Sequence, residues 1–165
     1  MTTTDRTATK QYLTFRLGDG VFALDIARVR EVLDFTTVTK VPRMPDFLRG
    51  VINLRGSVIA VADLGLKLGM AMTERSVNTC VIIAEIEVDG KTTLLGALAD
   101  SVQEVIELDA DALQPVPRIG ARLNTEFIQG IGKQNDRFII VLEIDKVFSS
   151  EEISQAQTVQ AEQVQ

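Results

Sequence analysis

The chain has 165 residues and a formal net charge of -6, and 45% of its residues are apolar against 24% charged. This length fits one domain or two small domains packed together, and the composition is that of an ordinary globular protein. The acidic balance argues against a nucleic-acid-binding protein, because such proteins present basic surfaces to phosphates. The sequence contains no histidine, which excludes a Ser-His-Asp triad, a histidine metal site and a histidine phosphocarrier.

The first ten residues, 1–10, are polar and rich in threonine, and we expect a flexible N-terminus. They contain no apolar segment of the signal-peptide type, and no stretch of the chain approaches the roughly 20 apolar residues of a membrane span. The single cysteine, Cys80, cannot form an internal disulfide. A reducing compartment is therefore the default, and we expect a cytoplasmic protein without direct membrane insertion.

From residue 11 to residue 148 the pattern is mostly that of short strands. Runs rich in valine and isoleucine alternate with turn signals that permit a positive φ angle, as tight hairpins require. Four hairpin turns are expected, at Gly18-Asp19-Gly20, Leu54-Arg55-Gly56-Ser57, Asp89-Gly90 and Gln134-Asn135-Asp136. Frequent turns between short apolar strands predict an all-β fold of the barrel or sandwich type.

Helical signals are few and short. Pro45–Leu48 fits one turn, Asp63–Gly69 fits a short helix that ends at glycine, and Asp109–Leu113 fits a capped turn before Pro115. Residues 149–165, which are rich in Gln, Ser, Ala and Glu, are expected to form a polar C-terminal tail, either disordered or a frayed helix. We assign this tail no function.

The sequence contains an internal duplication. Val29-Arg30-Glu31-Val32-Leu33 matches Val102-Gln103-Glu104-Val105-Ile106, and Asp46–Val51 matches Glu126–Ile131 in the same order. Val58–Leu64 then matches Phe138–Ile144, which is again an apolar strand followed by an acid. We interpret this as two similar β subdomains, with the second repeat at roughly 79–145. Their ends can be exchanged, which would allow the first subdomain to borrow a strand from the C-terminal part.

The acidic residues give no convincing catalytic or metal site. Glu31 and Glu104 are a candidate carboxylate pair for glycoside hydrolysis, but each also fits the polar side of an alternating strand in a separate repeat. The aspartates fit no EF-hand spacing and mostly occupy turns, where Asp accepts from backbone amides. No glycine-rich phosphate loop is present. We therefore expect no enzyme, no metal and no cofactor.

Arg55 and four valines leave two readings open. Arg55 at its hairpin turn is either a solvated turn residue or an arginine held by a carboxylate, with Glu31 the natural partner. Val29, Val32, Val102 and Val105 are core residues by default. In a scaffold of two small barrels, some of them can instead form an apolar patch in the cleft between barrels, and such patches mark partner sites.

At this point the sequence resembles a known family. The motifs that carry the resemblance are Phe22–Val32, Phe47–Gly56 with the following strand Val58–Leu64, Leu95–Val105 and Phe127–Gly132. They are similar to the CheW-type coupling proteins of bacterial chemotaxis, and the similarity covers about residues 11–148. One departure is Gly65, where many relatives carry a larger and often basic residue.

The resemblance implies a fold of two five-stranded SH3-like β-barrels packed together. It implies a non-catalytic adaptor that couples transmembrane chemoreceptors to the histidine kinase CheA, located in the cytoplasm at membrane-associated receptor arrays. The expected partners are the regulatory domain of CheA and the helical cytoplasmic tip of the receptors. By position, the receptor groove is expected at Val29, Glu31, Gly50, Arg55, Val102 and Val105, with a Glu31–Arg55 ion pair. Ile26 matches a kinase-binding position.

Three alternatives remain at the sequence level. A CheW homologue can serve another chemosensory pathway, such as pilus motility or second-messenger control, and the sequence does not separate these roles. A small-molecule or sugar-binding β domain predicts an enclosed pocket with aromatic residues, whereas the chain has seven Phe, one Tyr and no Trp. An enzyme that uses carboxylates predicts that Glu31 and Glu104 support turnover.

Overall fold

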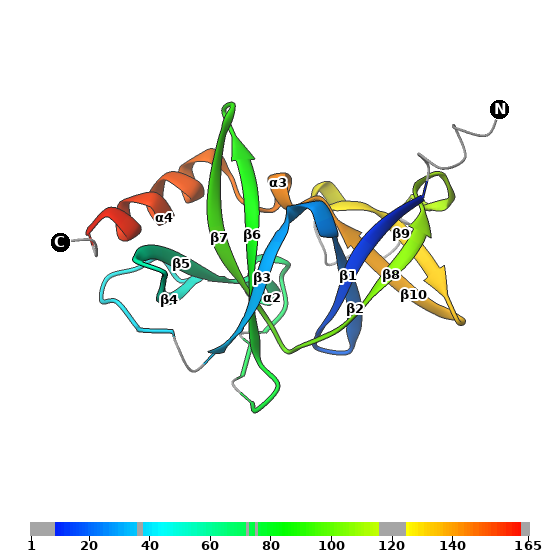
Figure 1. Cartoon of the computed structure of the whole chain (residues 1–165), viewed down its shortest axis with the longest axis horizontal. Helices are drawn as coiled ribbons and strands as arrows, with labels where there is room; N and C mark the ends of the chain where they lie inside the picture. The colour runs from blue at the N-terminus through cyan, green and yellow to red at the C-terminus, as the bar shows by residue number, and fades with distance from the viewer. Residues whose placement is uncertain (1–8, 36–37, 72, 75, 116–124, 163–165) are drawn as a thin grey trace.

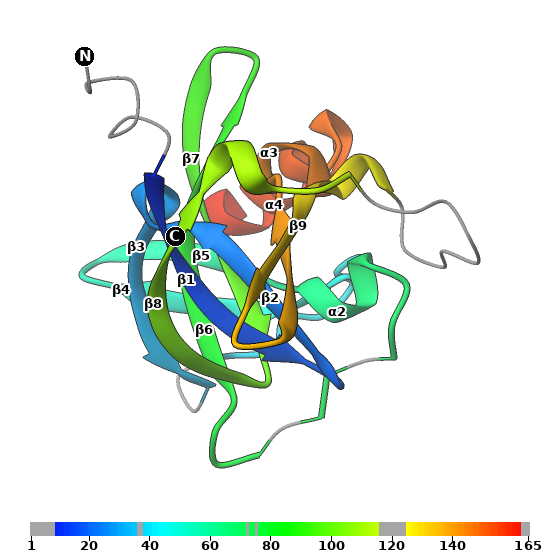
Figure 2. The same cartoon turned by 90° about the vertical axis from the view of Figure 1, so that its right-hand side faces the viewer.

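The structure is a computed structural model, and it describes residues 9–35, 38–71, 73–74, 76–115 and 125–162. Two five-stranded sheets lie side by side along the long axis of the molecule (Figure 1). We name them barrel A and barrel B. Barrel A has the strand order β8(Ser101–Asp109), β1(Thr9–Leu17), β2(Gly20–Asp25), β10(Arg137–Leu142) and β9(Ile128–Gln134). Barrel B has the order β3(Val29–Asp34), β6(Cys80–Val88), β7(Lys91–Ala99), β5(Ser57–Asp63) and β4(Leu48–Leu54). Figure 2 looks onto the end of barrel A, where the strands wrap around a common axis.

The two barrels share strands between the sequence repeats. The first repeat supplies β1–β5 and the second supplies β6–β10, yet β1 and β2 pair with β8 and β10, while β3 and β5 pair with β6 and β7. Each barrel therefore combines the first hairpin of one repeat with the last three strands of the other. This exchange is larger than the single strand allowed for from the sequence. The predicted all-β fold with two five-stranded subdomains is confirmed.

The four expected hairpins are all present. They join β1 to β2, β4 to β5, β6 to β7, and β9 to β10. Positive φ angles occur at Gly18, at Arg55 and Gly56, at Asp89 and Gly90, and at Asn135 and Asp136. Two successive residues with positive φ match the right-handed twist of the flanking strands, which explains why Gly, Asn and Asp prevail at these turns.

The apolar residues form three clusters. One lies inside barrel A and includes Tyr12, Ile106 and Val141, and one lies inside barrel B and includes Ile59 and Ile83. The third and largest lies between the barrels, where buried side chains of β1 and β2 meet those of β6 and β7. Phe15 and Phe22 stack there with ring centroids 6.3 Å apart. The barrels are therefore joined by a continuous apolar core that fixes their relative position.

Short helices cover the ends of the barrels. The predicted helix after β5 is α2(Leu64–Lys67), and the expected capped turn after β8 is the 3-10 helix η3(Ala110–Ala112). Pro45 forms a single hydrogen-bonded turn, with its carbonyl accepting from the N–H of Leu48 at 3.0 Å. The remaining short elements are η1(Ile26–Arg28), η4(Thr125–Phe127) and α3(Ile144–Val147).

The C-terminal segment is a helix, one of the two alternatives left open from the sequence, and it is packed on a barrel. Residues Ser150–Glu162 form the helix α4, which packs on β5 of barrel B (Figure 1). Ile153, Ala156 and Val159 are buried, and their spacing of three residues places them on one helical face. Gln160 Oε1 also accepts a hydrogen bond from the N–H of Ala60 at 2.8 Å. Three apolar contacts and one backbone contact thus order a segment whose composition is mostly polar.

An ion pair anchors the start of α4. Lys67 Nζ lies 2.5 Å from Glu152 Oε2 and within 6 Å of the ring centroids of Phe47, Phe127 and Phe148. Burial acts to raise the pKa of Glu152, but the hydrogen bonds from Lys67 and Ser149 outweigh it and leave that pKa below its usual value. The charged form of Glu152 therefore holds α4 against α2.

Candidate functional site

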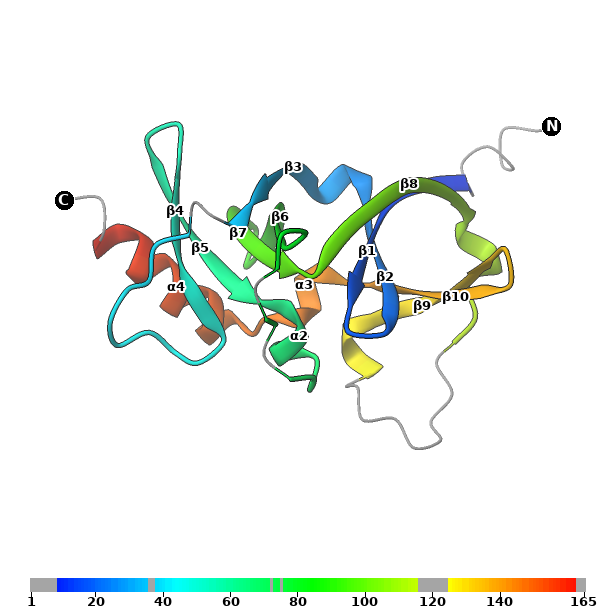
Figure 3. The same cartoon turned by 90° about the horizontal axis from the view of Figure 1, so that it is seen from below.

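Strands β3 and β8 carry the repeated Val-x-Glu-Val motif, and they lie on the same side of the molecule, one from each barrel (Figures 1 and 3). Val29 and Val102 are half-buried and pack against the core between the barrels. Val32 and Val105 are more exposed, at 38% and 48%. We name these four residues the valine strip. Two of its members leave apolar surface open to solvent, which in a stable core would be buried.

A β-bulge in each repeat explains how valines three positions apart share one face. Between Val29 and Glu31 the register with β6 shifts by one residue, and the register between β8 and β1 shifts in the same way between Val102 and Val105. An extra residue reverses the alternation of side chains along the strand. Val29 and Val32 therefore stand opposite Ala84 and Ile82, which both face the core between the barrels.

Val32 was not among the groove residues expected from the resemblance. The available signal was the repeat itself, since Val32 in the first block corresponds to Val105 in the second. The structure gives the two residues equivalent positions opposite Ile82 and Leu13. We therefore add Val32 to the candidate site.

The expected ion pair between Glu31 and Arg55 is present. Arg55 Nη1 donates to Glu31 Oε2 at 2.7 Å, with the arginine side chain 72% exposed and the glutamate 28% exposed. The hydrogen bond to Glu31 raises the pKa of the Arg55 guanidinium above its usual value. Glu31 lies on β3 and Arg55 lies in the hairpin between β4 and β5. Because β3 and β4 are the two edge strands of barrel B, the Glu31–Arg55 ion pair links the two edges of the sheet.

Gly50 is buried and has no side chain to offer a partner. A Cβ atom at Gly50 would lie 2.3 Å from the carbonyl oxygen of Thr39, which pairs with Val51 across a backbone bridge. The equivalent Gly130 approaches Leu113 and Gln114 in barrel A in the same manner. The glycine of the Phe-x-x-Gly motif therefore permits a close backbone approach that closes each barrel.

Ile26 lies in η1, the crossover from barrel A to barrel B. Asp25 caps this turn by accepting from the N–H of Ala27 at 3.0 Å. Ile26 is half-buried and packs against the core between the barrels. Its remaining exposed surface is on a different element from the valine strip. Ile26 thus lies on η1, immediately before β3, which carries Val29 and Val32 of the valine strip.

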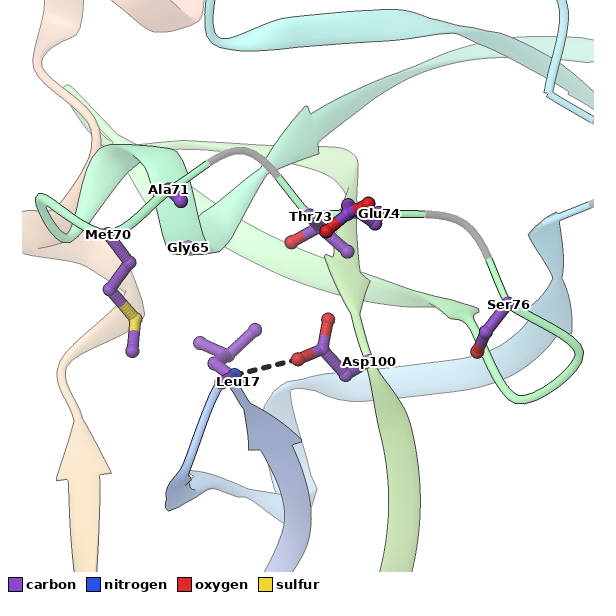
Figure 4. Close-up of a pocket in the computed structure, with 9 residues that line it drawn as sticks. Leu17, Gly65, Met70, Ala71, Thr73, Glu74, Ser76 and Asp100 are labelled. Atoms are coloured by element: carbon purple, nitrogen blue, oxygen red, sulfur yellow. Dashed lines mark hydrogen bonds between the residues drawn. The ribbon is translucent and has the colours of Figure 1, made fainter.

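A cleft of about 430 Å³ lies between the barrels next to α2 (Figure 4). Its walls include Leu17, Met70 and Asp100, and the carboxylate of Asp100 accepts from the N–H of Gly18 at 2.7 Å. Its described lining contains no aromatic side chain. A sugar site requires such side chains, so this cleft gives no support to the sugar-binding alternative.

The described residues contain no group of three or more His, Cys, Asp or Glu side chains placed to hold a metal ion. Glu31 and Glu104 lie on different barrels, on β3 and β8. The backbone of Glu104 is engaged with Thr14 Oγ1, which donates to its carbonyl at 2.7 Å and accepts from its N–H at 3.1 Å. In the part of the chain that the structure describes, no helix is long and apolar enough to cross a membrane.

Residues 11–152 match a family described as the CheW-like domain. The chain belongs to the CheW family. The chemotaxis protein CheW of Rhizobium meliloti is 34% identical over 143 residues, which cover 87% of this chain and 90% of that protein. The chemotaxis protein CheW of Klebsiella aerogenes is 32% identical over 148 residues, covering 90% and 87% respectively.

A solved structure shares the arrangement of the barrels. The scaffolding protein TtCheW from Thermoanaerobacter tengcongensis superposes with a TM-score of 0.75 at 34% sequence identity, covering 87% of this chain and 90% of that chain. Together with the family match, this assigns the chain a CheW-type scaffold role in chemotaxis. The expected resemblance is confirmed.

Proposed function

We propose that this CheW-family chain is a non-catalytic adaptor that couples chemoreceptors to the histidine kinase CheA in the cytoplasm, at receptor arrays. The receptor's helical tip docks on the valine strip, and Glu31 and Arg55 complete that surface, while Gly50 shapes it through its close backbone approach to Thr39. The regulatory domain of CheA binds a second surface that includes Ile26. The observation that carries the proposal is the exposure of Val32 and Val105 on the face shared by both barrels.

The valine strip fits a helical partner. An amphipathic helix binds by placing an apolar ridge in a groove, with contacts repeated every three or four residues. Two pairs of valines, one from each repeat at equivalent positions, offer apolar contacts of this kind. The guanidinium of Arg55, held in one orientation by Glu31, adds directional hydrogen-bond donors at the side of the groove.

Coupling requires a thermodynamic link between the two surfaces. A receptor changes kinase output only if it binds or orients the adaptor differently in its two signalling states. The continuous core between the barrels supports such a link, since Ile26, Val29 and Val102 all pack against it. A receptor bound to the valine strip and a kinase domain bound at η1 would therefore both contact side chains that pack against the core between the barrels.

The test compares two substitutions of the same kind. Val105→Asp places a charge on the valine strip, whereas Val77→Asp changes a residue that is 99% exposed in the loop before β6. We expect Val105→Asp to weaken binding to an immobilised receptor cytoplasmic fragment by about tenfold or more, as for a central interface residue, while Val77→Asp binds normally. Equal binding by both variants would refute the receptor surface.

The same two variants distinguish the receptor surface from the kinase surface. We expect both to bind the isolated regulatory domain of CheA as the unaltered chain does. A reconstituted kinase assay should then show receptor control of phosphorylation with Val77→Asp and its loss with Val105→Asp. If the chain binds neither the receptor fragment nor the kinase domain, the adaptor role itself fails.

A further inference from the structure

On the outer face of barrel A, no helix of the described residues covers an apolar patch, although one of its members, Ile140, also packs against the core between the barrels. Phe138 is 69% exposed at the start of β10, and Ile131 and Ile140 are half-buried beside it. Phe138 is paired with Lys133 and Ile140 with Ile131, so the three apolar side chains share one face of the sheet. We name Ile131, Phe138 and Ile140 the β10 patch. Its strands are distinct from β3 and β8, which carry the valine strip.

The equivalent face of barrel B is covered by α4. The repeat places Val51, Val58 and Ala60 at the positions of Ile131, Phe138 and Ile140, with the same cross-strand pairs. Val51 is 7% exposed, Ala60 is fully buried and Val58 packs against the core that includes Ile153, Ala156 and Val159 of α4. The face of barrel B is therefore covered by a helix of its own chain, whereas no helix among the described residues covers the equivalent face of barrel A.

We propose that the β10 patch docks an amphipathic helix of a partner protein in the way that α4 docks on barrel B. The partner helix carries short aliphatic residues three or four positions apart, like those of α4, with an acidic residue beside them. The acid is suited to Lys133, which is paired across the strands with Phe138. The Lys133 side chain is 63% exposed, and its ion pair with Asp136, at 4.0 Å, is a solvent-exposed one that an acid of the partner would compete with. This surface is additional to the receptor and kinase surfaces proposed above.

The two faces differ in one backbone contact, which sets the expected strength. In barrel B the N–H of Ala60 requires Gln160 as its acceptor. In barrel A the equivalent Ile140 is paired with Phe22 of β2. A helix on the β10 patch thus binds through apolar contacts and Lys133, without a buried backbone group to satisfy. We expect weaker docking than that of α4 on its own barrel.

A peptide of residues 149–165 serves as the probe, because it carries the apolar spacing of α4. A staple between Glu151 and Gln155, which are exposed and four residues apart, holds it helical, since short isolated helices are marginal in water. The peptide is titrated into the isotope-labelled full chain. We expect amide shifts concentrated at Ile131, Phe138 and Ile140.

The matched variants are Phe138→Asp and Val77→Asp, both of which replace an exposed apolar residue. We expect Phe138→Asp to weaken peptide binding about tenfold, as truncation of a central aromatic does, and Val77→Asp to bind as the unaltered chain does.

Peptide shifts confined to Val58 and Ala60, which would report displacement of the resident α4, overturn the proposal. So does equal binding by both variants, or no binding at millimolar peptide. Receptor and kinase binding by Phe138→Asp remain normal, so failure here leaves the adaptor role intact.

Discussion

Barrel A and barrel B have the same strand order and the same β-bulge in the Val-x-Glu-Val motif, but their polar contacts differ. In barrel B the buried carboxylate of Asp63 accepts from Arg49, from the N–H and hydroxyl of Thr73 and from the N–H of Leu66. Its counterpart Glu143 makes no capping hydrogen bond with α3. The residues that repeat build the barrels, and those that differ give each barrel its own attachments.

The hairpin tips show the same contrast. Arg55 reaches Glu31 in barrel B, whereas barrel A has Asn135 at the tip equivalent to Arg55 and Glu104 at the position equivalent to Glu31. The two hairpin tips beside the Val-x-Glu-Val strands thus differ, with an arginine at one of them only. On the receptor surface proposed above, this asymmetry would favour one orientation of a bound helical hairpin. The comparison predicts that paired substitutions in the two barrels have unequal effects.

The largest contrast is expected between Asp63→Ala and Glu143→Ala. Removing Asp63 leaves Arg49 and two backbone N–H groups without their buried acceptor, and the loss of one partner of a buried ion pair costs about 3–5 kcal/mol. Glu143→Ala should change the free energy of unfolding by less than about 0.5 kcal/mol. Urea denaturation of both variants measures the difference, and equal effects would contradict the contrast.

A smaller contrast is expected between the two barrel-closing glycines. Gly50→Ala places a Cβ atom 2.3 Å from a backbone oxygen, which can move only with its strand, whereas the nearest atom at Gly130 is the Leu113 Cβ at 2.8 Å. Overpacking costs about 1–3 kcal/mol, and we expect Gly50→Ala at the upper end and Gly130→Ala at the lower. Thermal melts compare the stability of the two variants. A larger loss of stability for Gly130→Ala would show that barrel A tolerates the added Cβ atom less well than barrel B.

Acid should release α4 from barrel B while leaving barrel A unchanged. The pKa of Glu152 is lowered in the folded state, so its stabilisation is complete above its usual pKa of about 4.5 and is lost as the pH falls through the folded value. The protection factor of the Ala60 amide, which corrects hydrogen exchange for its intrinsic pH dependence, should therefore fall at low pH more than the protection factor at Ile140. Glu152→Gln should remove this pH dependence, and unchanged Ala60 protection in acid would argue against the anchoring role.

The smallest effect on stability is expected from Arg55→Gln. Its ion pair is at the surface, and exposed pairs contribute little to folding. We expect an unchanged urea midpoint together with weaker binding to the receptor fragment. Asn135→Gln, at the equivalent tip of barrel A, is the control and should affect neither quantity. A shifted urea midpoint for Arg55→Gln alone would instead assign the pair a structural role.

Much of this architecture was predictable because it is encoded locally. The four turns follow from glycine, asparagine and aspartate, and the repeat follows from the order of its motifs. The Glu31–Arg55 pair was expected, and it is present. The bulges that place Val29 and Val32 on one face were not predicted, because an extra residue in a strand is defined only by its neighbour's register.

Two other features depend on tertiary contacts and have little local signal. The exchange of strands between repeats is decided by which sheet each hairpin joins, and hairpin patterns are the same in either arrangement. Helix α4 has only three buried apolar side chains in thirteen residues, so its order depends on the surface of β5 that receives it. A segment with so few apolar residues forms an ordered helix because β5 of barrel B provides the surface on which it packs.

The exchange of strands also sets an order of events on the ribosome. The strands of barrel B, β3–β7, are consecutive and end at Ala99, so all of them are synthesised before β8, β9 and β10. The hairpin β1–β2 emerges first, yet its neighbours β8 and β10 come last, and its apolar side chains must wait for them. Because such long-range pairing is slow and leaves strand edges unpaired meanwhile, the nascent N-terminal hairpin is the part of this chain that most needs a chaperone.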